Sequence, residues 1–315
     1  MSGTRCLYIG IGGGGDIVAT LADYLRNKEA SVVAGLTWKR RSHDPIGRPR
    51  RIGEFRNIRK YNDAIGVVTP ETTTYEGVRH IEAHVSELIG EPVLTIDISG
   101  GVFATAAAIE DYMKKEGISR VFGIDVGGDV LCNGDEPTVR SPIADQVMLG
   151  SLVLLGTDSG SVSVFGLGAD GELPLADFYR RIERITMQSL YATAARDRDL
   201  ALMDRAMNGQ TESSARAAEA ARRLTEERRM DIADTITAQR HPDLRSLAGP
   251  ARPVPLRDGR RTGELSNLTG LYLHLNPSAV YNASCFSEFV GNYDNIQDLA
   301  AEMRRRGIAT EFDDQ

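Results

Sequence analysis

The sequence of 315 residues lacks the patterns that mark several large classes of protein. Its three cysteines, Cys6, Cys132 and Cys285, are far apart and form no CxxC pair, so neither a disulfide framework nor a cysteine zinc site is indicated. It has no signal-peptide pattern and no apolar run long enough to span a bilayer. Its formal charge of −7 disfavours binding to nucleic acid or anionic lipid. We therefore expect a cytoplasmic protein that binds neither membranes nor nucleic acids.

Several familiar catalytic motifs are missing as well. There is no GxSxG nucleophile elbow and no phosphate-binding loop with its lysine, and the five histidines show no triad arrangement. His80 and His84 have the i, i+4 spacing of zinc ligands, but no third ligand accompanies them, so an exposed helix face is the favoured interpretation. Function must therefore be sought in other residues.

Short apolar runs alternate with helical stretches over residues 6–170, which predicts an α/β protein. The runs are apolar throughout, as in parallel strands that are covered on both faces. We expect a Rossmann-like, doubly wound and mostly parallel sheet with an added helical segment. The expected strands are Cys6–Ile9, Val32–Leu36, Ile65–Val68, Val93–Ile96, Val121–Ile124 and Val162–Phe165, and the expected helices are Ile17–Lys28, Tyr75–Ile89, Ala104–Lys115 and Ala144–Leu155.

Composition divides the chain into three parts. Residues 1–173 are expected to form the α/β core, 174–248 a segment of two or three long helices, and 249–315 a C-terminal β/α portion that packs back on the core. Within the helical segment, Thr211–Arg229 is so polar that we expect it to be exposed or partly mobile. The remaining expectations are a linker at 249–263, a strand at Leu271–Leu275, a helix at Ile296–Arg305 and a last strand at Ala309–Phe312.

A glycine-rich loop, Gly10-Ile11-Gly12-Gly13-Gly14-Gly15, joins the first expected strand to a helix that opens with Asp16. Strand, loop and helix in this order are typical of phosphate-binding sites. The second strand is followed by Lys39-Arg40-Arg41 instead of an acidic residue, which would suit the 2′-phosphate of NADP. Asp16 would repel a phosphate unless a cation lay between them, so it is either an N-cap or a contact to a ligand or metal.

Glycine lies next to aspartate or serine where four of the strands end. Because the carboxyl ends of parallel strands meet at one edge of a sheet, where ligands bind, these residues should converge. Carboxylates gathered there suit Mg²⁺ or Mn²⁺ binding or acid–base catalysis, although each turn could have glycine and aspartate for backbone reasons alone. The candidate catalytic residues are Asp16, Asp125, Asp129 and Asp145, of which Asp125 and Asp129 are the candidate metal ligands.

The candidate ligand-binding residues follow from the same strand ends and from an arginine-rich loop that could hold an anion. They are Gly10, Gly12, Gly13, Gly14, Gly15, Asp97, Ser99, Gly100, Gly127, Gly128, Ser141, Asp170, Glu172 and Arg50.

Four of these segments together resemble one known family. GGGGD at 12–16, DVGGD at 125–129, SPxAD at 141–145 and GxDGEL at 168–173, with the arginine-rich loop after Asp44-Pro45, are similar to the family catalogued as domain of unknown function 1152. The resemblance covers residues 6–175 well. It implies one shared fold and one shared site, and it brings no assigned reaction.

Three functions are compatible with these residues. The first is an enzyme that acts on a small polar metabolite, amino-acid-like or phosphorylated, by lyase, cyclase, hydrolase or transferase chemistry, with Mg²⁺ or Mn²⁺ as the cofactor. The second is an NADP-dependent oxidoreductase. The third is a non-catalytic sensor that binds a nucleotide or metabolite and signals through the helical segment. The expected partners are a small-molecule substrate and a second copy of the chain.

Overall fold

The computed structural model describes residues 4–156, 160–185, 190–207, 212–256 and 262–313. The strands are β1 Cys6–Gly10, β2 Ser31–Leu36, β3 Phe55–Arg56, β4 Arg59–Lys60, β5 Ile65–Val68, β6 Thr73–Thr74, β7 Val93–Ile96, β8 Arg120–Val126, β9 Gly160–Phe165, β10 Tyr191–Ala194, β11 Arg252–Pro255, β12 Thr262–Leu265 and β13 Leu271–Leu275. The helices are α1 Asp16–Ala19, α2 Leu21–Arg26, α3 Ile81–Ile89, α4 Gly101–Glu116, α5 Pro142–Leu155, α6 Leu175–Arg184, α7 Asp197–Met207, α8 Glu212–Ala221, α9 Glu226–Ala238, α10 Leu244–Ala248, α11 Pro277–Asn282 and α12 Ile296–Arg305.

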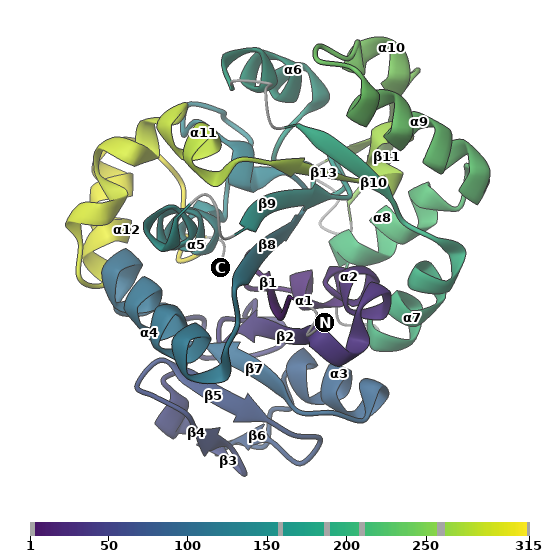
Figure 1. The fold of residues 1–315 in the computed structure, drawn as a ribbon. Coiled ribbons are helices and arrows are strands. Elements are labelled where there is room, and N and C mark those ends of the chain that lie inside the picture. Colours follow the sequence, from purple (N-terminus) through teal and green to yellow (C-terminus); the bar gives the residue numbers. More distant parts are fainter. Residues whose placement is uncertain (1–3, 157–159, 186–189, 208–211, 257–261, 314–315) are drawn as a thin grey trace.

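One large sheet organises the molecule, with the strand order β10-β13-β9-β8-β1-β2-β7-β5-β4 (Figure 1). Its five central strands, from β9 to β7, are parallel to one another. The strands at the two margins are antiparallel to their neighbours. Since the parallel strands all end on the same side, the segments that follow β1, β7, β8 and β9 lie along one edge of the sheet.

Apolar side chains on both faces of the sheet explain why helices cover both faces. Leu7 and Ile9 of β1 belong to one buried cluster, which also includes apolar residues of α4 and α5, whereas Val33 of β2 and Ile124 of β8 belong to a second cluster with α1, α2 and α7. Figure 1 shows α4, α5, α11 and α12 on one side of the sheet and α2, α3, α7 and α8 on the other. The central parallel strands are thus runs buried from two sides.

The prediction of an α/β protein with a large, mostly parallel sheet is confirmed, with corrections at the margins. Ile65–Val68 is a strand, but it runs antiparallel to β7. The helix expected at Tyr75–Ile89 begins at Ile81, and the one expected at Ile17–Lys28 is divided at Thr20 into α1 and α2. Within the described ranges, no helix has both the length and the apolar character needed to cross a bilayer.

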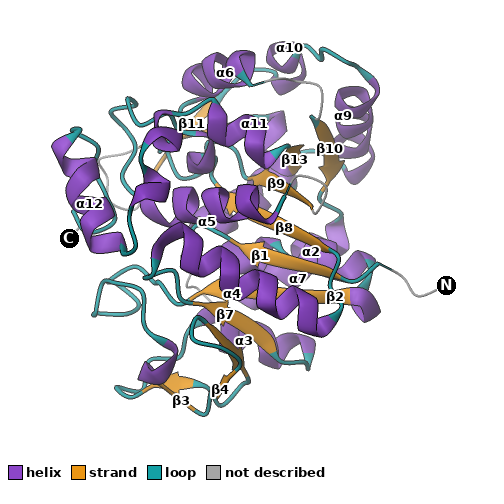
Figure 2. Ribbon diagram, turned by 60° about the vertical axis from the view of Figure 1, so that its left-hand side comes forward, coloured by secondary structure: helices purple, strands orange, loops and turns teal. Residues whose placement is uncertain are grey.

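The last expected strand, Ala309–Phe312, is wrong. These residues form an irregular stretch and a turn, in which the backbone N–H and the hydroxyl of Thr310 both donate to Asp313. The local hydrogen bonds of a threonine and an aspartate favour a turn over the expected strand. The consequence is that residues 308–313 lie beside α12 and α5 (Figure 2).

Residues 174–248 also differ from the prediction of two or three long helices. They contain α6, α7, α8, α9 and α10, and the short strand β10 pairs with β13 at the margin of the sheet. Thr211–Arg229, expected to be exposed or partly mobile, is exposed only in part: Arg222, Arg223 and Arg228 are exposed, but Ala217, Ala221 and Arg229 are fully buried. Alanines let α8 approach the core closely, and the Arg229 guanidinium donates to backbone carbonyls.

The linker expected at 249–263 contains two short strands. β11 and β12 pair as an antiparallel ribbon, and residues 257–261 between them lie outside the described residues. The ribbon contacts the core next to the site, where the backbone N–H of Glu264 donates to the carbonyl of Gly168 at 2.9 Å.

Candidate functional site

The glycine loop after β1 folds around the side chain of Asp16. The Asp16 carboxylate accepts the backbone N–H of Gly12 at 2.7 Å, and Asp16 itself is the first residue of α1. It therefore does not cap the helix, because Gly15 is at the N-cap and makes no side-chain cap. A Cβ atom at Gly12 would lie 2.4 Å from Asp16 Oδ2 and 3.3 Å from Asp145 Oδ1, so only glycine allows both carboxylates this close to the loop.

The second acidic segment follows β8. Asp125 is the penultimate residue of that strand and is fully buried, and its Oδ2 accepts the N–H of Gly128 at 3.0 Å. Gly127 and Gly128 have positive φ angles, which turn the chain sharply into a short helical turn that begins at Asp129. Burial, to which the charge of Asp125 adds, raises the pKa of Asp129 well above its usual range.

Asp145 completes the site from the first turn of α5. Its side chain is fully buried, and neither carboxylate oxygen has a hydrogen-bond partner. Oδ1 of Asp125 is likewise buried without a partner. Among the described residues, Asp16, Asp125 and Asp145 each offer a carboxylate oxygen within 4.8 Å of the other two. We call these residues the carboxylate trio; Asp129, expected as a metal ligand, lies next to it and is not one of the three.

Burial and mutual repulsion govern the protonation of the carboxylate trio. Burial raises the pKa of Asp16 to about 6. Burial, and then the charges of Asp145 and Asp16, raise the pKa of Asp125 well above its usual range. Burial, and then the charges of Asp129 and Asp16, raise the pKa of Asp145 in the same way. Three buried carboxylates of this kind are stable only if they hold protons or share a cation.

Asp170 and Glu172, from the loop after β9, form the wall between Gly127 and α5. A Cβ atom at Gly127 would lie 1.8 Å from the Asp170 carboxylate, which explains the glycine at that position. Glu172 accepts the backbone N–H groups of Arg140 and Ser141 at 2.7 and 2.9 Å and the Ser141 hydroxyl at 2.7 Å. Ser141 and Glu172, both expected at the site, thus hold each other at the start of α5.

Glu311 is a residue of the site that the sequence did not indicate. Its carboxylate accepts the backbone N–H groups of Ile143 and Ala144, at 3.1 and 2.8 Å, in the first turn of α5. Burial, to which the charge of Glu172 adds, raises the pKa of Glu311 to about 8. Its neighbour Phe312 packs on Trp38 with ring centroids 5.1 Å apart. No sequence signal near Glu311 predicts this position, since α5 is 168 residues away in the chain.

Other expected residues lie along the same edge but have different partners. Asp97 accepts the N–H of Ser99 at 2.9 Å, Gly100 caps α4, and the charges that act on Asp97 are those of Arg51 and Glu54. The guanidinium of Arg50 is held by Asp44 at 2.8 Å and Glu76 at 3.0 Å, so its ion pairs are with these residues and not with the trio.

Lys39, Cys132 and His80 are also paired or buried. Lys39, a candidate for the 2′-phosphate of NADP, is buried and pairs with Glu82 at 2.6 Å, and it donates to the carbonyl of Gly14. Cys132 is fully buried, and burial raises the pKa of its thiol well above its usual range, which opposes thiolate chemistry. The exposed helix face expected for His80 is wrong, because His80 precedes α3, is buried and contacts Asp44 at 2.9 Å.

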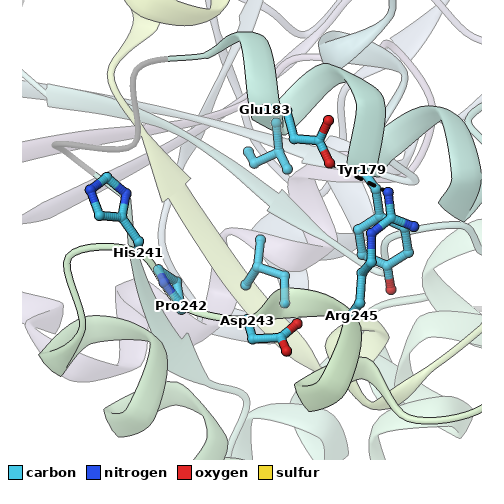
Figure 3. A pocket seen from close by; sticks show the side chains of 8 residues that line it. Tyr179, Glu183, His241, Pro242, Asp243 and Arg245 are labelled. Atoms are coloured by element: carbon cyan, nitrogen blue, oxygen red, sulfur yellow. Dashed lines mark hydrogen bonds and ion pairs between the residues drawn. The ribbon is translucent and has the colours of Figure 1, made fainter.

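A pocket of about 330 Å³ lies elsewhere, between α6 and the start of α10 (Figure 3). Arg245 stacks over Tyr179 at 4.3 Å and pairs with Glu183 at 3.5 Å on one side of it. Its lining includes none of the residues expected from the sequence. We therefore place the candidate site at the carboxylate trio, where buried charges lack partners, and not at this hollow.

Fold and site together define an α/β protein with an acidic candidate site at the carboxyl edge of a central parallel sheet. The chain belongs to the family described as Protein of unknown function (DUF1152), whose family model matches residues 7–238. This confirms the resemblance of the four motifs. The match contains the carboxylate trio and ends before Glu311. Comparison with curated proteins and with solved structures gave no match.

Proposed function

We propose that this chain is an enzyme that acts on a small polar metabolite and depends on a divalent cation held by Asp16, Asp125 and Asp145. The observation that carries the proposal is Asp145, a fully buried carboxylate with no hydrogen-bond partner on either oxygen. A buried charge in this state is costly unless a cation compensates it. Three oxygens within 4.8 Å of one another, all from carboxylates, suit Mg²⁺ or Mn²⁺.

The chemistry that a bound divalent cation would supply here is polarisation of a substrate oxygen. The chain's own contribution would be proton transfer, for which Asp129 is suited because burial and the nearby charge of Asp125 raise its pKa well above the usual range. Lyase, cyclase, hydrolase and group-transfer reactions all use this combination. We also propose that the sheet is of the Rossmann-like, doubly wound kind.

Two observations favour this proposal over an NADP-dependent oxidoreductase. The Asp16 carboxylate accepts a glycine-loop N–H that would otherwise be available to a phosphate. Lys39, expected to hold the 2′-phosphate, is paired with Glu82. A nucleotide bound in the usual way would have to displace both contacts.

Manganese binding tests the proposal directly, by electron paramagnetic resonance and by thermal unfolding. We expect Mn²⁺ to bind the unaltered chain and to raise its unfolding temperature, by mass action on the folded state. Asp145→Asn should abolish both effects. Asp135→Asn, at an exposed turn residue, is the matched control and should abolish neither. Equal stabilisation of the Asp145→Asn and unaltered chains by Mn²⁺ would refute the site.

Turnover needs a separate test. A mixture of small carboxylated and phosphorylated metabolites, incubated with the chain and followed by mass spectrometry, should show a change that depends on Mg²⁺ or Mn²⁺ and is lost in Asp125→Asn. If Mn²⁺ binds and no member of a broad panel changes, the chain is a metal-dependent binding protein and the enzymatic proposal fails.

A further inference from the structure

The first turn of α5 holds a carboxylate supplied by a distant part of the chain. The Glu311 carboxylate takes one N–H on each oxygen, from Ala144 at 2.8 Å and from Ile143 at 3.1 Å. Both donor residues are buried, and α5 has 14 residues, so its positive end faces this carboxylate. Without an acceptor here, two buried N–H groups would be left unsatisfied, which is unfavourable.

The carboxylate trio lies directly next to this position. Asp145 follows Ala144 in the chain, and the charge of Glu311 acts on its carboxylate. Because both oxygens of Asp145 are buried without partners, a ligand at this end of α5 is indicated independently of the helix. The glycine loop is close as well, since a Cβ atom at Gly13 would lie 3.6 Å from Ala144 Cβ.

Glu311 is suited to leave this position without unfolding its surroundings. Contacts other than those of Glu311 hold residues 308–313 in place. Ile308 is buried in the core, the Thr310 hydroxyl donates to Asp313, and Arg304 pairs with Asp313 at 2.7 Å. Glu311 is not fully enclosed, since part of the residue remains accessible to solvent. A change of its side-chain rotamer therefore suffices to open the two N–H groups.

We infer that the N–H groups of Ile143 and Ala144 form the subsite for a carboxylate group of the substrate, and that Glu311 fills this subsite until the substrate displaces it. The inference rests on the proposed function, in which the same substrate also contacts the cation. A planar group with two oxygens matches two consecutive donors, as Glu311 itself does. Glu172 and Asp145 nearby would repel a phosphate dianion more strongly than a carboxylate.

The test is a titration with acetate, followed at the backbone amides of Ile143 and Ala144 by NMR. In Glu311→Ala, acetate should enter the vacated subsite and shift both amide resonances. If Glu311 fills the subsite about nine-tenths of the time, the apparent Kd for acetate should be about tenfold lower in the variant than in the unaltered chain. Glu110→Ala, at an exposed glutamate of α4, is the control and should behave as the unaltered chain does.

Three results would overturn the inference. They are no acetate-dependent shift of the two amides in Glu311→Ala, the same Kd in the variant and the unaltered chain, and tighter binding of inorganic phosphate than of acetate. Glu311→Gln, which keeps an oxygen acceptor and the fold, should give an intermediate Kd and serves if the alanine variant does not fold. The titration is run in EDTA and again with Mn²⁺, so that failure of the subsite is seen separately from failure of the cation site.

Discussion

Two buried polar regions next to the sheet differ in whether their polar groups have hydrogen-bond partners. At one margin, His274 of β13 has both ring nitrogens satisfied, by Ser163 at 2.7 Å and by Thr193 at 2.9 Å. Nearby in the fold, the fully buried guanidinium of Arg229 donates to the carbonyls of Ala195, Ala221 and Leu224 and pairs with Asp197. At the carboxyl edge, by contrast, the carboxylate trio has three oxygens without any partner.

This difference distinguishes polar groups that stabilise the fold from polar groups that we expect to bind a ligand. A buried polar group whose partners are all present stabilises the structure. Its removal leaves those partners buried without a hydrogen bond. A buried charge without partners costs free energy, and the fold tolerates it only where another interaction offsets the cost. The four predictions that follow, from the largest effect to the smallest, test this contrast.

Removing Arg229 should have the largest effect on stability. Arg229→Ala should lower the free energy of unfolding by about 3–5 kcal/mol, because several buried carbonyls and Asp197 lose their donor. Urea unfolding measures the change. Arg228→Ala, at the exposed neighbour in the same helix, is the control and should cost less than about 0.5 kcal/mol. A cost for Arg229→Ala as small as that of the control would contradict its structural role.

Removing the charge of Asp145 should increase the stability, whereas removing Arg229 should decrease it. In EDTA at about pH 8, Asp145→Asn should raise the free energy of unfolding by about 1–3 kcal/mol, because an unpartnered buried charge is replaced by a neutral group. Urea unfolding of both chains under the same conditions measures it. A loss of stability in EDTA would mean that the Asp145 carboxylate is satisfied without a cation.

The pH dependence of stability without divalent cations should reflect the raised pKa values at the trio. The folded pKa of Asp16, about 6, lies above its ordinary value of 3.8, so the folded chain binds the proton more tightly than the unfolded chain does. The stability that Asp16 contributes is complete below about pH 4 and is lost as the pH rises through about 6. The pKa values of Asp125 and Asp145 are also raised, so their contributions are likewise lost as the pH rises. Each group contributes a slope of up to about 1.4 kcal/mol per pH unit.

Urea unfolding at several pH values between about 5 and 8 tests this slope. Saturating Mn²⁺ should reduce the slope or reverse it, because the carboxylates must lose their protons to bind the ion. Stability that is independent of pH over this interval in EDTA would argue against buried, uncompensated carboxylates.

Of the four measurements, the ring resonances of His274 should change least, and only at the acidic end. Burial, to which the charge of Arg26 adds, lowers its pKa to about 3, so the folded chain keeps the imidazole neutral. The unfolded chain is protonated below about pH 6.5, and the contribution of His274 to stability is therefore lost as the pH falls from there towards about 3. The chemical shifts of the His274 ring protons should stay unchanged between about pH 7 and 5. A change in these shifts over that interval would show that the ring is protonated there and is not shielded from water.

Much of the fold follows from local pattern. β7 and α12 have the bounds that apolar periodicity indicated, because the residues that form their buried faces lie close together in the sequence. β10 could not be found in this way, since Tyr191–Ala194 has only four residues, two of them alanine, among helix-forming residues. It becomes a strand because β13 offers it hydrogen bonds from a distant part of the chain.

The sequence by itself determined that acidic and glycine-rich segments gather at one edge, because parallel strands all end there. Only the tertiary structure decided which of these side chains act together. Asp145 lies with Asp16 and Asp125, Asp129 lies close enough for the charge of Asp125 to act on it, and Arg50 pairs with Asp44. Glu311 also lies at the site, in a turn where a strand was predicted. The physical reason is that hydrogen bonds and charge compensation depend on distances in space, which spacing along the chain does not encode.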